Sequence, residues 1–96
     1  MSKIIEPSKI FVSEESIEYA DGSVVSKTIL KKTTGNITLF AFDIGEGLSE
    51  HSSPYEALVQ LLDGKAEIII GGTSYNLNTG QNIILPANVH HLFRFR

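Results

Sequence analysis

The chain has no cysteine among its 96 residues. Disulfide bonds, thiolate catalysis and thiolate metal sites are therefore excluded as explanations of its function. Basic residues are few as well, since eight Lys and Arg stand against eleven Asp and Glu and give a formal net charge of −3. A chain without a basic excess is a poor partner for nucleic acid or for an anionic membrane, and we expect neither.

Long apolar runs are also missing. The longest are four or five residues, whereas a membrane-spanning helix needs about 20. The N-terminal stretch has no apolar core of the length found in signal peptides. We therefore expect a soluble, cytoplasmic protein with a single domain over residues 1–96. A core of this size is marginal on its own, so homodimerisation is the expected partnership.

Short runs rich in Ile, Val, Leu, Phe and Thr alternate with turn signals along the chain, and no stretch keeps a helical period. This pattern is typical of an antiparallel all-β domain, either a sandwich or a barrel. Asp63-Gly64 predicts a tight hairpin between the apolar runs on its two sides, because both residues tolerate positive φ. Gly71-Gly72 predicts a second turn of this kind.

The last stretch, residues 90–96, alternates between two kinds of side chain. His91, Phe93 and Phe95 fall on one side of the predicted strand, and His90 and Arg94 fall on the other. The arginine marks its side as the solvent face. The alternation therefore predicts that His91 points inward with the two phenylalanines and that His90 points outward.

Two blocks with defined spacing carry most of the functional information. In the first, Gly45 is followed after five residues by His51, then by Ser53 and Ala57, and Gly64 comes six residues further on. In the second block, which starts 16 positions after the first one ends, a glycine at position 80 is followed after five residues by a Pro-Ala-Asn turn and then, two residues later, by a histidine at position 91.

These blocks resemble the paired motifs of the cupin superfamily, and residues 36–96 resemble a small, RmlC-like cupin along their whole length. The resemblance implies a cupin-type double-stranded β-helix, an all-β jelly-roll barrel with two sheets around an open pocket. Residues 1–35 would supply N-terminal strands. The resemblance also implies a homodimer, often with exchange of an N-terminal strand. Small cupins usually have one more apolar strand after the segment that matches 91–96, and without it a sheet edge stays open.

The departures from the cupin motifs bear directly on metal binding. A metal-bearing cupin uses three His and one Glu, and only His51 and His91 match that set. Ser53 stands in place of the second His and Ala57 in place of the Glu, while Glu56 faces the opposite side of the strand. The resemblance thus implies, as one hypothesis, a dioxygenase or isomerase with iron, manganese, nickel or zinc on His51 and His91. Functional sites normally have at least three protein ligands.

A second hypothesis is acid–base catalysis without metal. His51 is a suitable general base near neutral pH, and Tyr55 shares its predicted inward parity. Some sugar-epimerising cupins resemble this arrangement, with a His base and a Tyr acid. Such a base is usually oriented by a carboxylate, for which Asp43 and Glu50 are the candidates. The alternative for Tyr55 is an aromatic at the barrel mouth with its hydroxyl in water.

The third hypothesis is a binding module, and it is the one we favour. The predicted inward set gives a mostly apolar cavity with polar groups at one end, which is the composition of small-ligand pockets. The alternative is that the aromatic side chains simply fill the barrel. The candidate pocket comprises His51, Ser53, Tyr55, Val59, His91 and Phe93, with the two histidines as polar anchors for a small-molecule ligand.

Overall fold

The computed structural model describes residues 5–95 and divides the chain into two compact units. Unit 1 is Met1–Asp43 and unit 2 is Ile44–Arg96. The division leaves both predicted motif blocks in unit 2. The assignment of the whole chain to one domain stays a prediction.

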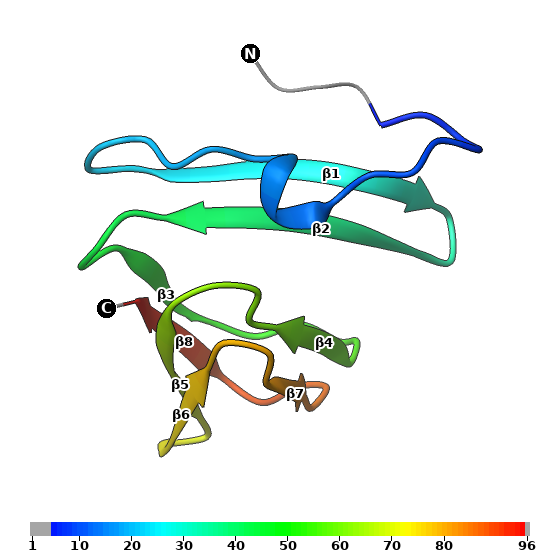
Figure 1. Cartoon of the computed structure of the whole chain (residues 1–96). Helices are drawn as coiled ribbons and strands as arrows, with labels where there is room; N and C mark the ends of the chain where they lie inside the picture. The colour runs from blue at the N-terminus through cyan, green and yellow to red at the C-terminus, as the bar shows by residue number, and fades with distance from the viewer. Residues whose placement is uncertain (1–4, 96) are drawn as a thin grey trace. The chain divides into compact units, whose positions relative to one another are not determined.

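Unit 1 is a long antiparallel hairpin preceded by one short helical turn (Figure 1). A 3-10 turn, η1, covers Ser13–Glu15, and the strands are β1 (Val24–Lys32) and β2 (Gly35–Phe42). The register is regular except for a bulge between Thr28 and Leu30. The buried side chains of β2 are those of Leu39 and Ala41, which alternate with more exposed neighbours as expected for a strand.

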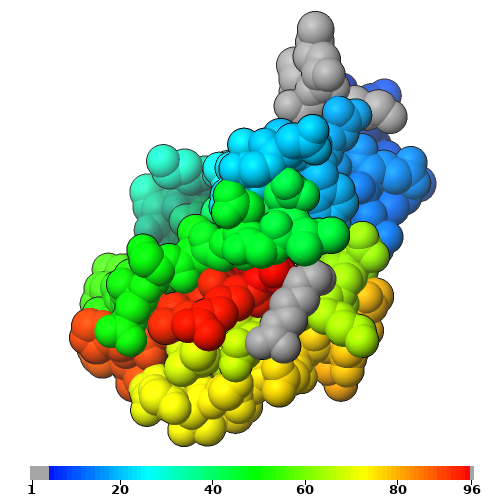
Figure 2. Space-filling view, turned by 90° about the vertical axis from the view of Figure 1, so that its left-hand side faces the viewer, coloured from blue at the N-terminus to red at the C-terminus, as the bar shows by residue number. Residues whose placement is uncertain are grey.

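Unit 2 contains the remaining six strands, arranged in two antiparallel sheets. The first sheet has the strand order β3-β8-β5-β6, and the second pairs β4 with β7. Figure 2 shows β8, in red, between the green of β3 and the yellow of β5 and β6. The bounds are β3 Gly47–His51, β4 Ala57–Gln60, β5 Lys65–Ile70, β6 Thr73–Asn78, β7 Asn82–Leu85 and β8 His91–Phe95.

The core of unit 2 lies where these two sheets face each other. Ile68 is fully buried, at 0% exposure, and is directly opposite Phe93 of β8 in the register. The buried cluster consists of Leu61, Ala66, Ile68, Leu77 and Leu85. We call the side of the four-stranded sheet that carries Ile68 its inner face. Burial of a side chain of this size is worth about 1.5–3 kcal/mol, so this cluster is the main apolar contribution within unit 2.

The all-β prediction is confirmed, and the described residues contain no α-helix. Of the two predicted hairpins, the one at Gly71-Gly72 is confirmed: it joins β5 to β6, and both glycines have positive φ (54° and 85°). The hairpin at Asp63-Gly64 is wrong. That turn carries the chain from one sheet to the other, because β4 pairs with β7 and not with β5. Within residues 5–95, no helix has the length and apolar character needed to cross a membrane.

Candidate functional site

A bulge in β3 brings two histidines that are distant in sequence to the same point on the inner face. Leu48 is opposite Phe93, and His51 is opposite His91. The three-residue step on β3 therefore matches a two-residue step on β8, so one residue of β3 is extra. The extra residue changes the alternation, and His51 faces inward together with His91. We call these two residues the histidine pair.

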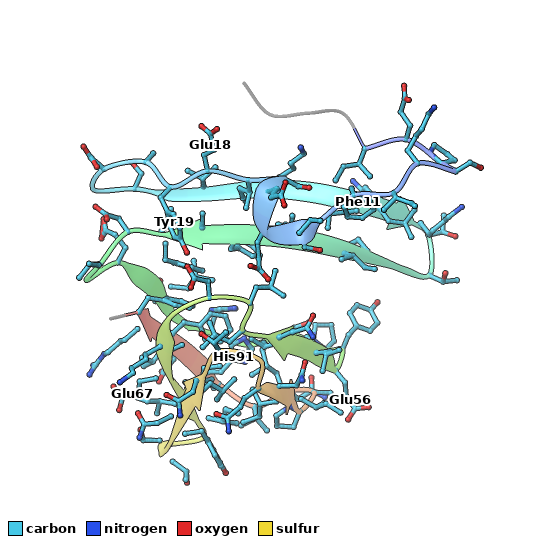
Figure 3. All side chains as sticks on the ribbon, viewed as in Figure 1. Phe11, Glu18, Tyr19, Glu56, Glu67 and His91 are labelled. Atoms are coloured by element: carbon cyan, nitrogen blue, oxygen red, sulfur yellow. The ribbon has the colours of Figure 1, made fainter. Side chains whose placement is uncertain are left out.

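The rings of the histidine pair touch through their Nε2 atoms, which are 2.9 Å apart. Their ring centroids are 4.2 Å apart and the ring planes are inclined by 74°. Figure 3 shows His91 inside unit 2 and Glu67 on the other side of the four-stranded sheet. His91 is 5% exposed, whereas His51 is exposed, so a molecule from solution reaches the pair through His51.

Backbone carbonyl groups hold the other nitrogen of each ring. His51 Nδ1 lies 2.8 Å from the carbonyl oxygen of Ser49, and His91 Nδ1 lies 3.2 Å from that of Val89. A carbonyl oxygen only accepts, so each Nδ1 donates its proton. The carbonyls thus fix both the ring orientation and the nitrogen that carries hydrogen.

The three contacts of the histidine pair determine how many N–H groups would be needed to satisfy all of them. Each carbonyl oxygen needs an N–H at the Nδ1 that faces it, and the Nε2–Nε2 contact needs one more N–H. Two neutral imidazoles supply only two N–H groups. All three contacts are satisfied together when the pair holds a third proton, and the pair then has one positive charge.

His91 is the ring on which this charge is more costly. Burial lowers the pKa of His91 below its ordinary value of 6.5, and the charge of His51 lowers it further. The hydrogen bond to Val89 opposes these effects, and His90 adds a smaller lowering.

The polar residues predicted beside the histidines lie in the loop between β3 and β4. Ser53 is half-buried, and its Oγ accepts a hydrogen bond from the backbone N–H of Tyr55 at 3.2 Å. The carbonyl of Ser53 also accepts from the N–H of Asn88 at 2.7 Å, which ties this loop to the turn before β8. Ser53 is thereby positioned close in sequence and structure to the strand end that carries His51.

The inward parity predicted for Tyr55 is wrong. Inward parity requires position 55 to lie in a strand, but β4 begins at Ala57 and Tyr55 lies in a bend with 76% of its surface exposed. Pro54 and the hydrogen bond to Ser53 Oγ give this segment a turn rather than an extended conformation. Two-residue alternation does not apply across such a turn. Tyr55 is therefore an aromatic residue with access to water, not a group that faces the histidine pair from a strand.

The apolar residues of the predicted pocket pack against the core. Val59 and Phe93 are partly buried and contact the buried cluster of unit 2. Phe93 also stacks on His91, with ring centroids 5.7 Å apart and planes inclined by 21°. These side chains fill the space between the sheets, as the barrel-filling alternative predicts for them. The polar end near His51 is the part of the predicted pocket that faces solvent.

The carboxylates considered as orienting groups do not stand behind His51. Glu50 points to the outer side, where its Oε1 is 3.8 Å from Nδ1 of His90, and both side chains are mostly exposed. Asp43 accepts a hydrogen bond from the N–H of Gly22 in unit 1. The orienting acceptor of His51 is instead the carbonyl of Ser49. Sequence reasoning missed it because every residue carries a carbonyl, and only the register shows which one meets a side chain.

The described residues do not by themselves form a resident metal site. The Nε2–Nε2 separation of 2.9 Å suits two ligands of one ion, but residues 5–95 contain no group of three or more His, Cys, Asp or Glu that could hold a metal. Figure 3 shows Glu56 well away from His91, so it does not replace the missing carboxylate. Two imidazoles are fewer than the three protein ligands of functional zinc sites.

The sequence from within β2 onwards matches a known family. The Cupin_2 model, described as a cupin domain, matches residues 38–96. The chain therefore belongs to the Cupin_2 family, and it is a small cupin. The match includes both motif blocks and the histidine pair.

Solved structures agree with this assignment. A conserved protein of unknown function from Streptococcus pyogenes is 31% identical, with a TM-score of 0.88, and the match covers 97% of this chain and 82% of that one. A cupin 2 conserved barrel domain protein from Leptotrichia buccalis is 34% identical, with a TM-score of 0.81 over 84% of this chain and 39% of that one. The cupin jelly-roll prediction is thus confirmed.

Among curated proteins, the chain is 33% identical to polyketide synthase CurC of Streptomyces cyaneus. The aligned region has 63 residues, which are 65% of this chain. The chain spans 41% and 53% of the lengths of two curated relatives that it matches.

Proposed function

We propose that the chain binds a small organic molecule at the histidine pair, through an acidic oxygen of the ligand. The proposal is carried by the 2.9 Å contact between the two Nε2 atoms, with both Nδ1 atoms held by carbonyls. With a third proton on the pair, all three contacts would be satisfied and the pair would carry one positive charge. A carboxylate or enolate next to the exposed His51 would neutralise that charge by a charge-assisted hydrogen bond.

The surroundings of the pair support a binding role. Phe93 stacks on His91 and gives the pair an apolar neighbour on the core side, and Ser53 adds a hydroxyl in the adjoining loop. Small-ligand sites combine a few polar groups with such apolar surface. The relative named polyketide synthase CurC gives a chemical direction, because polyketide chains carry β-dicarbonyl groups that ionise to enolates.

Calorimetric titration of tag-free protein tests the proposal. The probes are carboxylates and β-diketones, and each is compared with a neutral isostere. We expect the acidic probe to bind more tightly than its isostere, and more tightly at about pH 6 than at about pH 8, where histidine loses its proton. His51→Gln and His91→Gln should each abolish the preference, while His90→Gln should keep it. An equal preference in all three variants would contradict the proposal.

Metal analysis of the same preparation separates this function from that of a metal-dependent dioxygenase or isomerase. We expect substoichiometric iron, manganese, nickel and zinc, because the ligand set is short. Stoichiometric metal that disappears in the His51→Ala, His91→Ala double variant would overturn the acidic-ligand proposal and favour the enzyme.

We further propose that the chain forms a homodimer. Leu58 of β4 and Ile84 of β7 are partners in the register, and they are 68% and 60% exposed. Adjacent exposed aliphatic side chains of this size favour association. Light scattering should give a dimer that the Leu58→Lys, Ile84→Lys double variant converts to a monomer. A wild-type monomer at all concentrations would contradict the proposal.

A further inference from the structure

A concave surface of unit 2 lies along β6 and the start of β7, and neither histidine of the pair is among the residues that line it. It is an open groove of about 700 Å³. The residues that line it are Ser74, Tyr75, Asn76, Leu77, Gln81, Asn82 and Ile83. We call it the β6–β7 groove. None of its lining residues belongs to the predicted pocket, and none carries a charge.

The end of the groove is held in shape by the turn that joins its two strands. The N–H of Gln81 donates to the carbonyl of Asn78 at 3.0 Å, and the N–H of Gly80 donates to the carbonyl of Leu61 at 2.7 Å. Gly80 has a φ of 88°, which favours glycine. The side chains at this end are therefore presented from a fixed backbone.

Two amide side chains that line the groove, from residues consecutive in sequence, offer opposite hydrogen-bonding groups. The Oε1 atom of Gln81 accepts from the N–H of Asn78 at 2.8 Å, so its Nε2 donors are left for a ligand. The Nδ2 atom of Asn82 donates to the carbonyl of Gly80 at 3.4 Å, so its Oδ1 acceptor is left for a ligand. A donor beside an acceptor matches two adjacent hydroxyl groups, since each hydroxyl can both donate and accept.

The remaining lining provides apolar surface. Tyr75 is 42% exposed, and an exposed aromatic ring can pack on the C–H face of a sugar while its hydroxyl stays in water. Ser74 donates its hydroxyl proton to Glu67 at 2.6 Å, and Arg94 lies 3.9 Å from the same carboxylate. The charge nearest to this wall is therefore already paired.

We propose that the β6–β7 groove binds a neutral saccharide, with Tyr75 under the sugar ring and Gln81 and Asn82 on two adjacent hydroxyls. An anionic ligand is disfavoured because no Lys or Arg within residues 5–95 lines the groove. An extended peptide is the competing occupant, because β6 ends its sheet among the described strands. The paired amide donor and acceptor favour the saccharide, since a peptide would bond to the strand backbone instead.

The test is an NMR titration of ¹⁵N-labelled full-length protein with maltose, cellobiose, lactose and chitobiose. We expect at least one to bind with a dissociation constant on the order of 1 mM, with shifts at residues 74–77 and 81–83. Tyr75→Ala should weaken that binding about tenfold, the size of one lost aromatic contact. Tyr19→Ala, which removes an exposed tyrosine of unit 1, should leave it unchanged.

A matched pair of isosteric variants separates ligand contact from loss of folding. Gln81→Glu keeps the oxygen that accepts from Asn78 but removes the donors, so saccharide binding should be lost while the spectrum stays dispersed. Asn82→Asp keeps the acceptor, so binding should change by less than about twofold. No binding of any of the four sugars, equal effects of both variants, or shifts centred on the histidine pair would overturn the proposal. So would preferential binding of an uncharged extended peptide.

Discussion

The inner face of unit 2 has two ends that differ in their side chains. At the core end, Ile68 is fully buried within a cluster of aliphatic residues. At the histidine end, His91 is nearly as buried, but its ring contacts a second imidazole and a carbonyl oxygen. Burial thus provides stability at one end and lowers the pKa of a histidine at the other.

The largest expected effect tests the core end. Ile68→Ala should lower the free energy of unfolding by about 2–5 kcal/mol, since it leaves a cavity in a fully buried site. Ile69→Ala is the matched control, because Ile69 is the next residue and faces the other side of the sheet. Urea denaturation measures both. Equal losses would mean that the core end is not where unit 2 derives its stability.

The pairing of β3 with β8 holds the histidine end together, and Gly47 tests it. A Cβ at this position would collide with the carbonyl oxygen of Phe93. Gly47→Ala should lower the free energy of unfolding by about 1–3 kcal/mol through overpacking. It should also move the two rings of the histidine pair apart, which changes the NMR chemical shifts of His51 and His91. Gly35→Ala meets no atom within 4 Å and should change neither measurement. An unchanged histidine signal in the Gly47 variant would show that the pair does not depend on this strand pairing.

Substitutions at two adjacent histidines compare the inner face of the sheet with its outer face. His91→Ala should destabilise the protein by about 1–3 kcal/mol, because it removes a buried ring and leaves the Val89 carbonyl without its donor. His90 has a side chain that is 66% exposed, so His90→Ala should stay within about 0.5 kcal/mol of wild type. Thermal unfolding distinguishes the two. A larger loss for His90 would reverse the assignment of faces.

The smallest effect is the pH dependence of stability. Burial and His51 lower the pKa of His91 from 6.5, so the unfolded chain binds a proton at a pH where folded His91 remains neutral. Stability is therefore full above pH 6.5 and falls as the pH drops through 6.5 towards the folded value. Denaturant titrations across this range should show the decline, and His91→Gln should reduce it. A rise in stability on acidification would contradict the lowered pKa.

The sequence alone was sufficient to predict the family, the all-β class and which side chains of the last strand point inward. The alternation from His90 to Phe95 placed His91 inward, and the motif spacing brought His51 near it. The sequence was not sufficient where the structure depends on which strands pair with each other and on where a strand begins. The Asp63-Gly64 turn has the composition of a hairpin, yet its flanking strands pair elsewhere, and Tyr55 follows a proline turn that interrupts the alternation. The homodimer, the cytoplasmic location and the ligand stay predictions.

The bulge in β3 has a consequence for how this site can change. In a regular strand that starts with Leu48 facing inward, the next inward side chain is that of Glu50, and His51 faces water. The single extra residue therefore decides whether the partner of His91 is a carboxylate or a second imidazole. A shift of the β3 register by one residue after Leu48 would exchange one chemistry for the other, with every side chain of the opposing strand left in place.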